Sequence, residues 1–336
     1  MPTTVEIVVE APEDIGERVD VVLGRRAPGV SRRVARSLAL AGAVRRDGAI
    51  VRPSQRVAHG DRLVLAVDTA AAPPEIAALH VTDRFVYVDK PAGVHTLRLR
   101  PDDPPSLADA VAARHPECAS ASGPARDGGA IHRLDRETTG VVAFARSPAA
   151  WVAGRAAIAH ASTLKLYLAL CHLDDARPWP PVRAGVTAAP VPAALAELAV
   201  PLRACTQPPM LSALASIHVD LPLGHGATRR HVAVRPDGQP AHSQITALTR
   251  GEHHCLVAVH LRHGHRHQVR VHLAALGMPI VGDARYGGGE GALRLHAAAL
   301  QLWLERQPEP RVLAPLHDAF AQRLQQLSLC APQPRP

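Results

Sequence analysis

An aspartate lies between two arginines in the segment IHRLDRETTG, residues 131–140. Arg133 precedes Asp135, Arg136 follows it directly, and the apolar Leu134 adjoins it. A carboxylate in apolar surroundings is costly to bury unless it is paired and hydrogen-bonded, and carboxylates held in this way serve as general bases or nucleophiles. An aspartate with arginine neighbours is more often a surface ion pair. The spacing by itself therefore leaves a catalytic and a structural interpretation open.

A run of histidines is the second group that could do chemistry. His263, His265 and His267 alternate, so on a strand their side chains would share one face and form a conceivable set of metal ligands. No acidic or cysteine residue stands at a recognised ligand spacing, and we expect no metal site. The full cluster comprises His253, His254, Cys255, His260, His263, His265, His267 and His272.

Several common catalytic motifs are missing from the sequence. It contains no GxxxxGK[ST] phosphate loop, no HExxH zinc motif and no GxSxG nucleophile motif. ATP-driven, zinc-protease and serine-hydrolase functions therefore lack their minimum parts. We expect no cofactor.

Composition indicates a globular, basic protein. The chain has 336 residues, of which 47% are hydrophobic and 20% charged, and its length favours a large unit plus a smaller one. Its net charge of +8 and pI near 9.9 suit a polyanionic partner. The five scattered cysteines include no CxxC pair, and the N-terminal residues are acidic rather than basic and then apolar. We therefore expect a cytoplasmic protein without disulfides, a leader or a membrane span.

The N-terminal residues have the pattern of a small α/β module. Residues 5–9 alternate like a strand, and apolar residues then recur at helical spacing through residues 17–44. Ser31 is placed to cap a second helix within this range. The basic face of that helix includes Arg32, Arg33 and Arg36.

A larger domain follows an alanine- and proline-rich linker. Its first predicted strand, Phe85–Asp89, ends at Lys90-Pro91 and a turn at Gly93, and loops of this kind can approach a ligand closely. The predicted organisation is a module at residues 1–68, a linker at 69–75, a second domain at 76–330 and a tail at 331–336.

Residues 17–67 resemble the small RNA-binding module first seen in a ribosomal protein of the small subunit. The resemblance rests on RVD (18–20), SRR (31–33), AGAV (41–44), DG (47–48), RPS (52–54) and GD (60–61). It implies that the arginines of the second helix follow RNA phosphates, contacts that supply affinity without reading sequence. A merely solvated basic face is the alternative.

HRLDRETTG, residues 132–140, resembles the HRLDRxTSG signature of RluA-type pseudouridine synthases, with Thr139 where the family generally has serine. The resemblance covers nearly the whole chain, because further segments occur in the family's order. The chain's only lysines, Lys90 and Lys165, both fall inside these segments. The segments are DKPAG (89–93), STLKLYLAL (162–170), HGHRHQVRVHLAALGMPIVGDARYG (263–287), LHA (295–297) and APLHDAF (314–320).

The resemblance implies an enzyme that converts uridine to pseudouridine within RNA. The bond from ribose C1′ to N1 breaks, the base turns, a bond to C5 forms and the C5 proton leaves, without consumption of a redox equivalent, metal or nucleotide. Asp135 is the implied catalytic carboxylate. Attack on the sugar and removal of a ribose proton both remain open. The base must be extruded from its stack for either route.

The same resemblance implies roles for other residues. Arg270 is the guanidinium that favours the charged form of Asp135. Tyr167 stacks on the target base and is placed to act in removal of the C5 proton, and Val269 packs beneath the base. Periodicity alone would make Tyr167 and Val269 core positions of strands. The predicted substrate-binding residues are Arg133, Arg136, Val269, Lys90, Lys165, His267 and Gln268.

Two segments depart from the family pattern. TGRxHQ reads HGHRHQ here, so that His265 stands at the usual arginine position and Arg266 follows it, compatible with a basic contact shifted by one residue. Residues 172–216 fit no family segment, and their proline- and alanine-rich composition predicts a partly helical insertion or a surface excursion.

The expected fold is α+β. The resemblance implies a mixed, mostly antiparallel central sheet, joined to the small N-terminal helical module. We expect a monomer without an obligate protein partner that acts on RNA, with large-subunit ribosomal RNA favoured and transfer RNA as the alternative. A non-catalytic RNA-binding protein that retains the pocket is the alternative to an enzyme.

Overall fold

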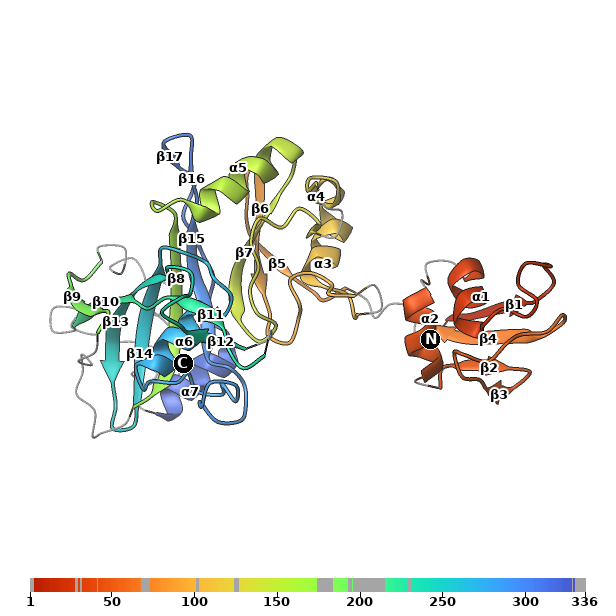
Figure 1. The fold of residues 1–336 in the computed structure, drawn as a ribbon. Coiled ribbons are helices and arrows are strands. Elements are labelled where there is room, and N and C mark those ends of the chain that lie inside the picture. The colour runs from red at the N-terminus through yellow and green to blue at the C-terminus, as the bar shows by residue number, and fades with distance from the viewer. Residues whose placement is uncertain are drawn as a thin grey trace, which may run out of the picture. The chain divides into compact units, whose positions relative to one another are not determined.

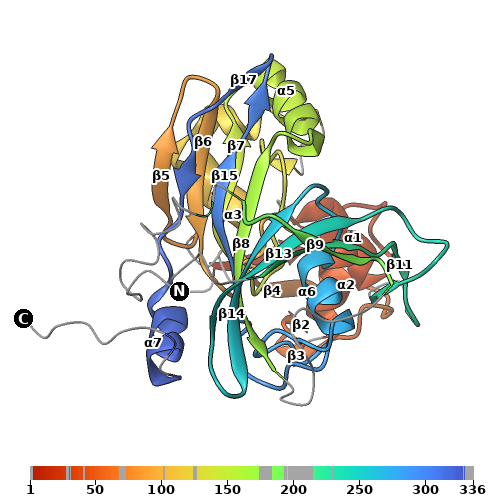
Figure 2. The same ribbon diagram turned by 90° about the vertical axis from the view of Figure 1, so that its left-hand side faces the viewer.

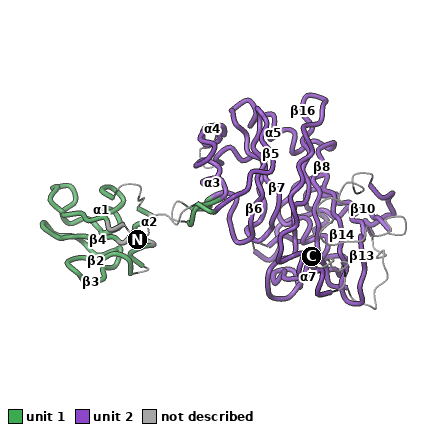
Figure 3. The backbone as a smooth tube through the Cα atoms, turned by 180° about the vertical axis from the view of Figure 1, so that it is seen from behind, with its two compact units in different colours: residues 1–74, 98–106 green, residues 75–97, 107–336 purple. Residues whose placement is uncertain are grey.

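The protein divides into two compact units, residues 1–74 with 98–106 and residues 75–97 with 107–336 (Figure 3). Among the described residues, no helix is both long and apolar enough to cross a lipid bilayer. The structure is a computed structural model that describes residues 3–27, 30, 32–40, 42–67, 73–100, 103–123, 127–173, 184–192, 195, 215–228, 231–327 and 329.

The first unit is an antiparallel sheet with two helices, in the strand order β1-β4-β2-β3. Its core is built from fully buried valines and leucines such as Val22 and Leu63. The predicted basic helix forms, and Arg32 and Arg36 are exposed on it, whereas Ser31 and the side chain of Arg33 lie outside the described residues. Its elements are β1 (Thr3–Val8), α1 (Val19–Arg26), α2 (Arg32–Leu40), β2 (Val44–Arg46), β3 (Ala49–Ile50) and β4 (Arg62–Val67).

A ten-stranded sheet dominates the second unit (Figure 1). Its strands are β5 (Ala77–Val81), β6 (Phe85–Lys90), β7 (Thr139–Ala145), β8 (Leu164–His172), β9 (Val186–Ala189), β10 (Ser216–Asp220), β13 (His242–Arg250), β14 (His254–Leu261), β15 (Leu295–Gln301) and β18 (Val312–Leu313). Two small hairpins add β11 (Leu223–His225) with β12 (Val232–Val234), and β16 (Trp303–Leu304) with β17 (Gln307–Pro308). The helices are α3 (Leu107–Arg114), α4 (Pro116–Ala119), α5 (Pro148–Ala159), α6 (Gln268–Ala275) and α7 (Asp318–Gln326).

The large sheet is mixed and mostly antiparallel, which confirms the expected α+β fold. Its order is β5-β6-β7-β15-β8-β14-β13-β10-β9, with β18 also paired to β15. Only the β7–β15 pair is parallel among the described strands of this sheet. A parallel neighbour needs a long connection, and here the chain runs from residue 145 to residue 295 between the two strands.

The parallel pairing of β7 with β15 aligns residues of three strands that are far apart in the sequence. Gly140 of β7 pairs with Ala297 of β15, and Ala297 pairs with Tyr167 of β8. Gly140 has a φ of 109°, and a Cβ there would lie 2.2 Å from the carbonyl oxygen of Ala297. Glycine is therefore required where HRLDRETTG enters the sheet. This alignment of strands brings the loop before β7 close to Tyr167.

The two faces of β8 have different neighbours because side chains alternate along a strand. Leu166 and Leu168 pack with Phe320 of α7 in one buried cluster. On the other face, Tyr167 packs with the cluster that contains Val269 and Leu273 of α6. Figure 2 shows α6 and α7 on opposite sides of strands β8 and β14. The α6 face is the one that carries the site described below.

The expectation of a strand at Val269 was wrong, and the strand arrangement considered for the histidines does not occur. Val269 lies in helix α6, not on a strand, and β14 ends at Leu261, so His263 and His265 are in a loop. Within the predicted insertion 172–216, residues 186–189 form the edge strand β9 beside β10, and much of the remainder lies outside the described residues.

Candidate active site

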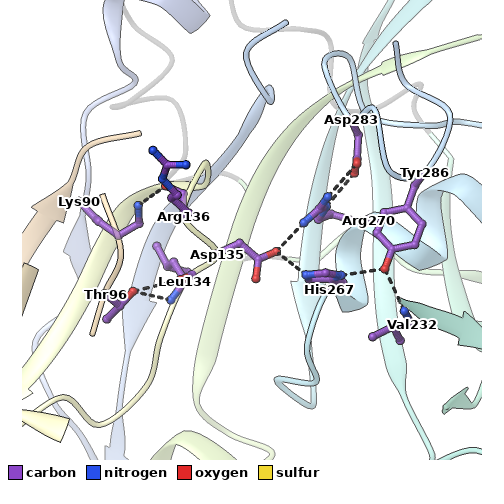
Figure 4. Close-up of polar contacts among 10 residues, drawn as sticks. All are labelled: Lys90, Thr96, Leu134, Asp135, Arg136, Val232, His267, Arg270, Asp283 and Tyr286. Carbon is purple, nitrogen blue, oxygen red and sulfur yellow. Dashed lines mark hydrogen bonds and ion pairs between the residues drawn. The ribbon is translucent and has the colours of Figure 1, made fainter. Parts of the chain in front are cut away.

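The backbone around Asp135 is fixed on both sides. The Thr96 hydroxyl accepts a hydrogen bond from the Leu134 N–H at 3.1 Å and donates to the Leu134 carbonyl at 3.0 Å. After Asp135, the ammonium of Lys90 donates to the Arg136 carbonyl at 2.8 Å (Figure 4). Thr96 and Lys90 are both buried, so these bonds are shielded from water. The loop therefore presents Asp135 from a rigid base.

Arg270 joins Asp135 to a second carboxylate. Its Nη1 donates to Asp135 Oδ2 at 2.9 Å, while Nε and Nη2 donate to the two oxygens of Asp283 at 2.8 Å each. Burial alone would lower the pKa of Arg270, but the bonds and charges of Asp283 and Asp135 raise it above its ordinary value. The Asp283 side chain is fully buried, and that of Asp135 is 28% exposed. The planar guanidinium of Arg270 thus directs one N–H toward the accessible carboxylate of Asp135.

His267 lies on the same side of Asp135 as Arg270. Its Nε2 is 3.6 Å from Asp135 Oδ2, and its Nδ1 is 2.7 Å from the hydroxyl of Tyr286 (Figure 4). Burial lowers the pKa of His267 to about 4, and nearby arginines add to this against the opposing charge of Asp135. The lowered pKa favours the neutral imidazole of His267 at physiological pH.

Asp135 opens into a pocket of about 690 Å³. This volume lies in the range of roughly 300–1,000 Å³ that is usual for small-molecule sites. Tyr167 and Val269 line it together with Asp135 and Arg270. Burial, and then the charge of Asp135, raise the pKa of Tyr167 above its ordinary value. An aromatic ring, an apolar side chain and a paired carboxylate in one pocket can hold a planar base beside a reactive acid group.

The predicted substrate-binding residues fall into two groups. Arg133 and His267 line the pocket, and Arg133 is exposed. Arg136 is exposed but donates from Nε to the Gly93 carbonyl at 2.9 Å, so it ties two loops together. Lys90 is fully buried and donates to the carbonyls of Pro91, Val94 and Arg136. All three of its protons are used within the protein, so Lys90 supports the loop, and its contact with substrate stays a prediction.

Lys165 and Gln268 also face the protein more than the pocket. Lys165 borders the pocket, but its ammonium donates to the carbonyls of Ile158 at 2.8 Å and Arg262 at 2.9 Å. Burial lowers the pKa of Lys165 to about 8. The Gln268 amide donates to the His242 carbonyl at 2.9 Å and accepts from the His265 N–H at 3.2 Å. We interpret both residues as supports of the pocket wall.

The rings of His242, His263 and His265 follow one another in a stack. The rings of His242 and His263 are 5.1 Å apart, and those of His263 and His265 are 5.5 Å apart. His265 Nε2 donates to the Pro240 carbonyl at 2.8 Å. No group of three or more histidine, cysteine or acidic side chains suited to a metal occurs among the described residues.

Three residues of the site were not singled out in the sequence. Asp283 and Tyr286 lie within VGDARYG, which was matched as a block without individual roles, and their position after a glycine turn could have indicated them. Thr96 carries no such signal, because its bonds to Leu134 depend on contacts between residues 38 positions apart.

Family models match most of the chain. Residues 84–275 match the RNA pseudouridylate synthase family, and residues 17–63 match the S4 domain. A Ribosomal large subunit pseudouridine synthase D from Xanthomonas campestris pv. campestris is 30% identical over 84% of this chain and 74% of that protein. A protein of the same name from Pseudomonas aeruginosa is 27% identical over 86% of this chain and 79% of its own length.

A solved structure shows the same fold. Human RNA Pseudouridylate Synthase Domain Containing 4 superposes with a TM-score of 0.50 at 20% identity, covering 75% of this chain and 93% of the human one. The family match alone spans more than half of the 336 residues. The chain belongs to the RNA pseudouridylate synthase family, whose members convert uridine to pseudouridine in RNA.

Proposed function

We propose that this synthase modifies uridine in large-subunit ribosomal RNA, with Asp135 as the catalytic carboxylate. The observation that carries the assignment of Asp135 is its position: it is the carboxylate that Arg270 presents to the pocket beside Tyr167. An accessible carboxylate beside a guanidinium could act in either way, by attack on C1′ or by removal of a ribose proton.

The choice of RNA is supported by relatives and by the first unit. The two relatives described above are named for the large ribosomal subunit. The S4 match at residues 17–63 covers the helix on which Arg32 and Arg36 are exposed. Such arginines can follow phosphates of a folded RNA without reading its sequence. We further propose that the protein acts as a monomer, since the three predicted catalytic residues meet within a single chain, and that it works in the cytoplasm, as expected for a bacterial ribosomal RNA enzyme.

The residues that line the pocket suggest separate roles in the reaction. The extruded uracil would lie against Tyr167 and Val269 while the C1′–N1 bond breaks and the C1′–C5 bond forms. Tyr167 lines the pocket, where it would assist loss of the C5 proton. Arg133, exposed at the pocket, would contact a phosphate of the extruded nucleotide.

Pseudouridine mapping tests this proposal. Total RNA from cells with and without the gene would be treated with carbodiimide and read by reverse transcription, with rescue by wild-type protein or Asp135→Asn. We expect one or a few stops in large-subunit ribosomal RNA to vanish without the gene and to return only with wild-type protein. Asp237→Asn, a change at an exposed ion pair with Arg235, is the matched control and should rescue fully.

Each part of the proposal has its own contrary result. Stops that change only in transfer RNA would contradict the substrate but keep the reaction. Full rescue by Asp135→Asn would contradict the assignment of Asp135.

A further inference from the structure

Tyr286 touches both partners of Asp135. Its hydroxyl lies 2.7 Å from His267 Nδ1, and its ring lies 5.1 Å from the guanidinium carbon of Arg270. The same hydroxyl accepts a hydrogen bond from the Val232 N–H at 3.2 Å. That N–H can only donate, so the hydroxyl keeps its own proton available for His267 Nδ1. Tyr286 thereby connects β12 to the active site.

The tautomer of His267 follows from this arrangement. A neutral imidazole carries one N–H, and a nitrogen that accepts from a hydroxyl cannot be the one that bears it. A carboxylate only accepts, so the tautomer with its proton on Nε2, which faces Asp135 Oδ2, is the one that satisfies both neighbours of His267. The separation of 3.6 Å is longer than a hydrogen bond, as is common for catalytic contacts before substrate binds.

Both neighbours of Asp135 address the same oxygen. Arg270 Nη1 and His267 Nε2 approach Oδ2, and Oδ1 has no such contact among the described residues (Figure 4). These contacts restrict rotation of the carboxylate and leave one defined oxygen for the substrate. Fixing the reactive atom in a productive geometry is a large part of enzymatic rate enhancement.

We propose that His267 and Tyr286 are positioning residues, in which the Tyr286 hydroxyl sets the tautomer of His267 and the Nε2–H of His267 helps to hold Oδ2 of Asp135, so that Oδ1 reacts. This inference rests on the proposed role of Asp135. It reassigns His267, which the sequence led us to expect at the substrate itself.

The backbone of His267 supports a specific role for this side chain. His267 precedes α6 with a φ of 56°, in the left-handed region that non-glycine residues rarely adopt. Its side chain makes no capping hydrogen bond to the helix and is only 7% exposed. Strained positions of this kind persist where the surrounding structure holds a functional side chain in place.

Single-turnover kinetics on a ribosomal RNA transcript that the wild-type enzyme modifies would test the inference. Tyr286→Phe removes only the hydroxyl, and we expect the maximal rate to fall about tenfold with little change in KM. Tyr87→Phe is the matched control, because the hydroxyl of Tyr87 is buried and has no hydrogen-bond partner among the described residues. It should keep the wild-type rate.

Two substitutions of His267 separate positioning from packing. Glutamine can place an amide N–H where Nε2 lies, so His267→Gln should stay within about threefold of the wild-type rate. His267→Leu fills the space without a donor and should lose about tenfold or more. Thermal melting of each variant shows whether it is folded, and the glutamine–leucine comparison remains decisive if Tyr286→Phe does not fold.

The pH–rate profile adds a signature that a structural role would not produce. His267 is surrounded by Asp135, Arg270, Arg266, Arg285 and Tyr286. Without the Tyr286 hydroxyl, Nδ1 is free to take a proton, and an imidazolium would compete for the Asp135 carboxylate. The acid limb of Tyr286→Phe should therefore move upward by about one pH unit, whereas the acid limb of His267→Gln should not move upward.

The outcomes distinguish this inference from the proposed function. If wild-type protein is active and Asp135→Asn is inactive, but Tyr286→Phe and His267→Leu both react at the wild-type rate, the positioning role is overturned while the role of Asp135 stands. If Asp135→Asn reacts like wild type, the proposed function itself fails.

Discussion

Arg270 holds two carboxylates at once, and only a planar guanidinium can do this. Its Nε and Nη2 engage Asp283, which leaves Nη1 for Asp135. A lysine has one nitrogen at the end of a flexible chain and cannot reach both acids with matched geometry. Asp283 is fully buried, so any loss of its partner leaves a charge without compensation.

We therefore expect Arg270→Lys to lower the maximal rate at least about a hundredfold, because the Asp135 oxygen is no longer fixed. Release of tritium from RNA labelled at uridine C5 measures this rate. The matched control is Arg235→Lys, since Arg235 forms a similar two-pronged pair with Asp237 but on the surface. A loss in Arg270→Lys no greater than in the control would contradict the expectation.

Lys90 stabilises the loop that presents Asp135. Replacement by methionine would leave three carbonyls without their donor, in a position that water does not reach. We expect Lys90→Met to lower the free energy of unfolding by about 3 kcal/mol and the reaction rate several-fold. Urea unfolding gives the first quantity. Arg84→Met, which removes only an exposed ion pair with Glu305, should cost less than about 1 kcal/mol.

Individual site residues could be predicted from the sequence because each of them stands in a short motif. Asp135, Tyr167 and Arg270 lie in short motifs, and the structure brings all three to one pocket. The catalytic roles themselves stay predictions. The internal bonds of Lys90 could not be predicted, because motif position does not reveal where an ammonium points. Its partners include the carbonyl of Arg136, 46 residues away.

At the scale of elements, the parallel contact between β7 and β15 determines where the Asp135 loop enters the sheet. The strand at residues 85–89 was predicted from its apolar run, and the structure extends it only to Lys90. The pairing of β7 with β15 was not derivable from local pattern, because it joins residues more than 150 positions apart. The apolar run at Val269 was similarly ambiguous between helix and strand, as short apolar runs generally are.

Gly140 is the residue on which this contact depends. Alanine there would have an unfavourable φ of 109° and a Cβ 2.2 Å from the Ala297 carbonyl oxygen. We expect Gly140→Ala to lower the free energy of unfolding by about 2–4 kcal/mol, measured by urea unfolding. Gly123→Ala is the control, because a Cβ at Gly123 would meet nothing within 4 Å. Equal stability of the two variants would contradict the need for glycine at the contact between β7 and β15.

At the scale of the whole molecule, buried neutral histidines couple stability to pH. Burial lowers the pKa values of His132, His272 and His296 to about 4 each. Both nitrogens of His272 are already hydrogen-bonded, to the Ser243 hydroxyl and the Leu221 carbonyl. Since a carbonyl only accepts, Nε2 bears the proton of the neutral form, and a second proton on Nδ1 would disturb the contact with Ser243.

The direction of the effect follows from proton linkage. Between about pH 6.5 and 4 the unfolded chain binds protons at these histidines and the folded chain does not, so stability decreases as pH falls through this window. Each histidine contributes on the order of 1–3 kcal/mol. Urea unfolding at half-unit steps from pH 7.5 to 4.5 measures the trend. A free energy of unfolding that stays constant over this range would contradict it.

The first unit is expected to contribute affinity rather than chemistry. Arg32 and Arg36 are exposed on α2, within the S4 match. We expect Arg36→Gln to weaken RNA binding, and to reduce the slope of log affinity against log salt by about 1, without changing the rate at saturating RNA. Filter binding at several salt concentrations gives the slope. Arg62→Gln, which removes an exposed pair with Glu6, is the control and should leave the slope unchanged.

Because both lysines are buried, the folded protein shields its lysine amines from covalent modification. The 336 residues contain only Lys90 and Lys165, whose side chains are hidden beside the pocket and its loop. An amine-directed reagent such as an N-hydroxysuccinimide ester would therefore reach neither lysine side chain of the native protein. Acylation of Lys90, followed by peptide mass spectrometry, would report opening of the loop that carries Asp135, so the protein contains its own footprinting probe.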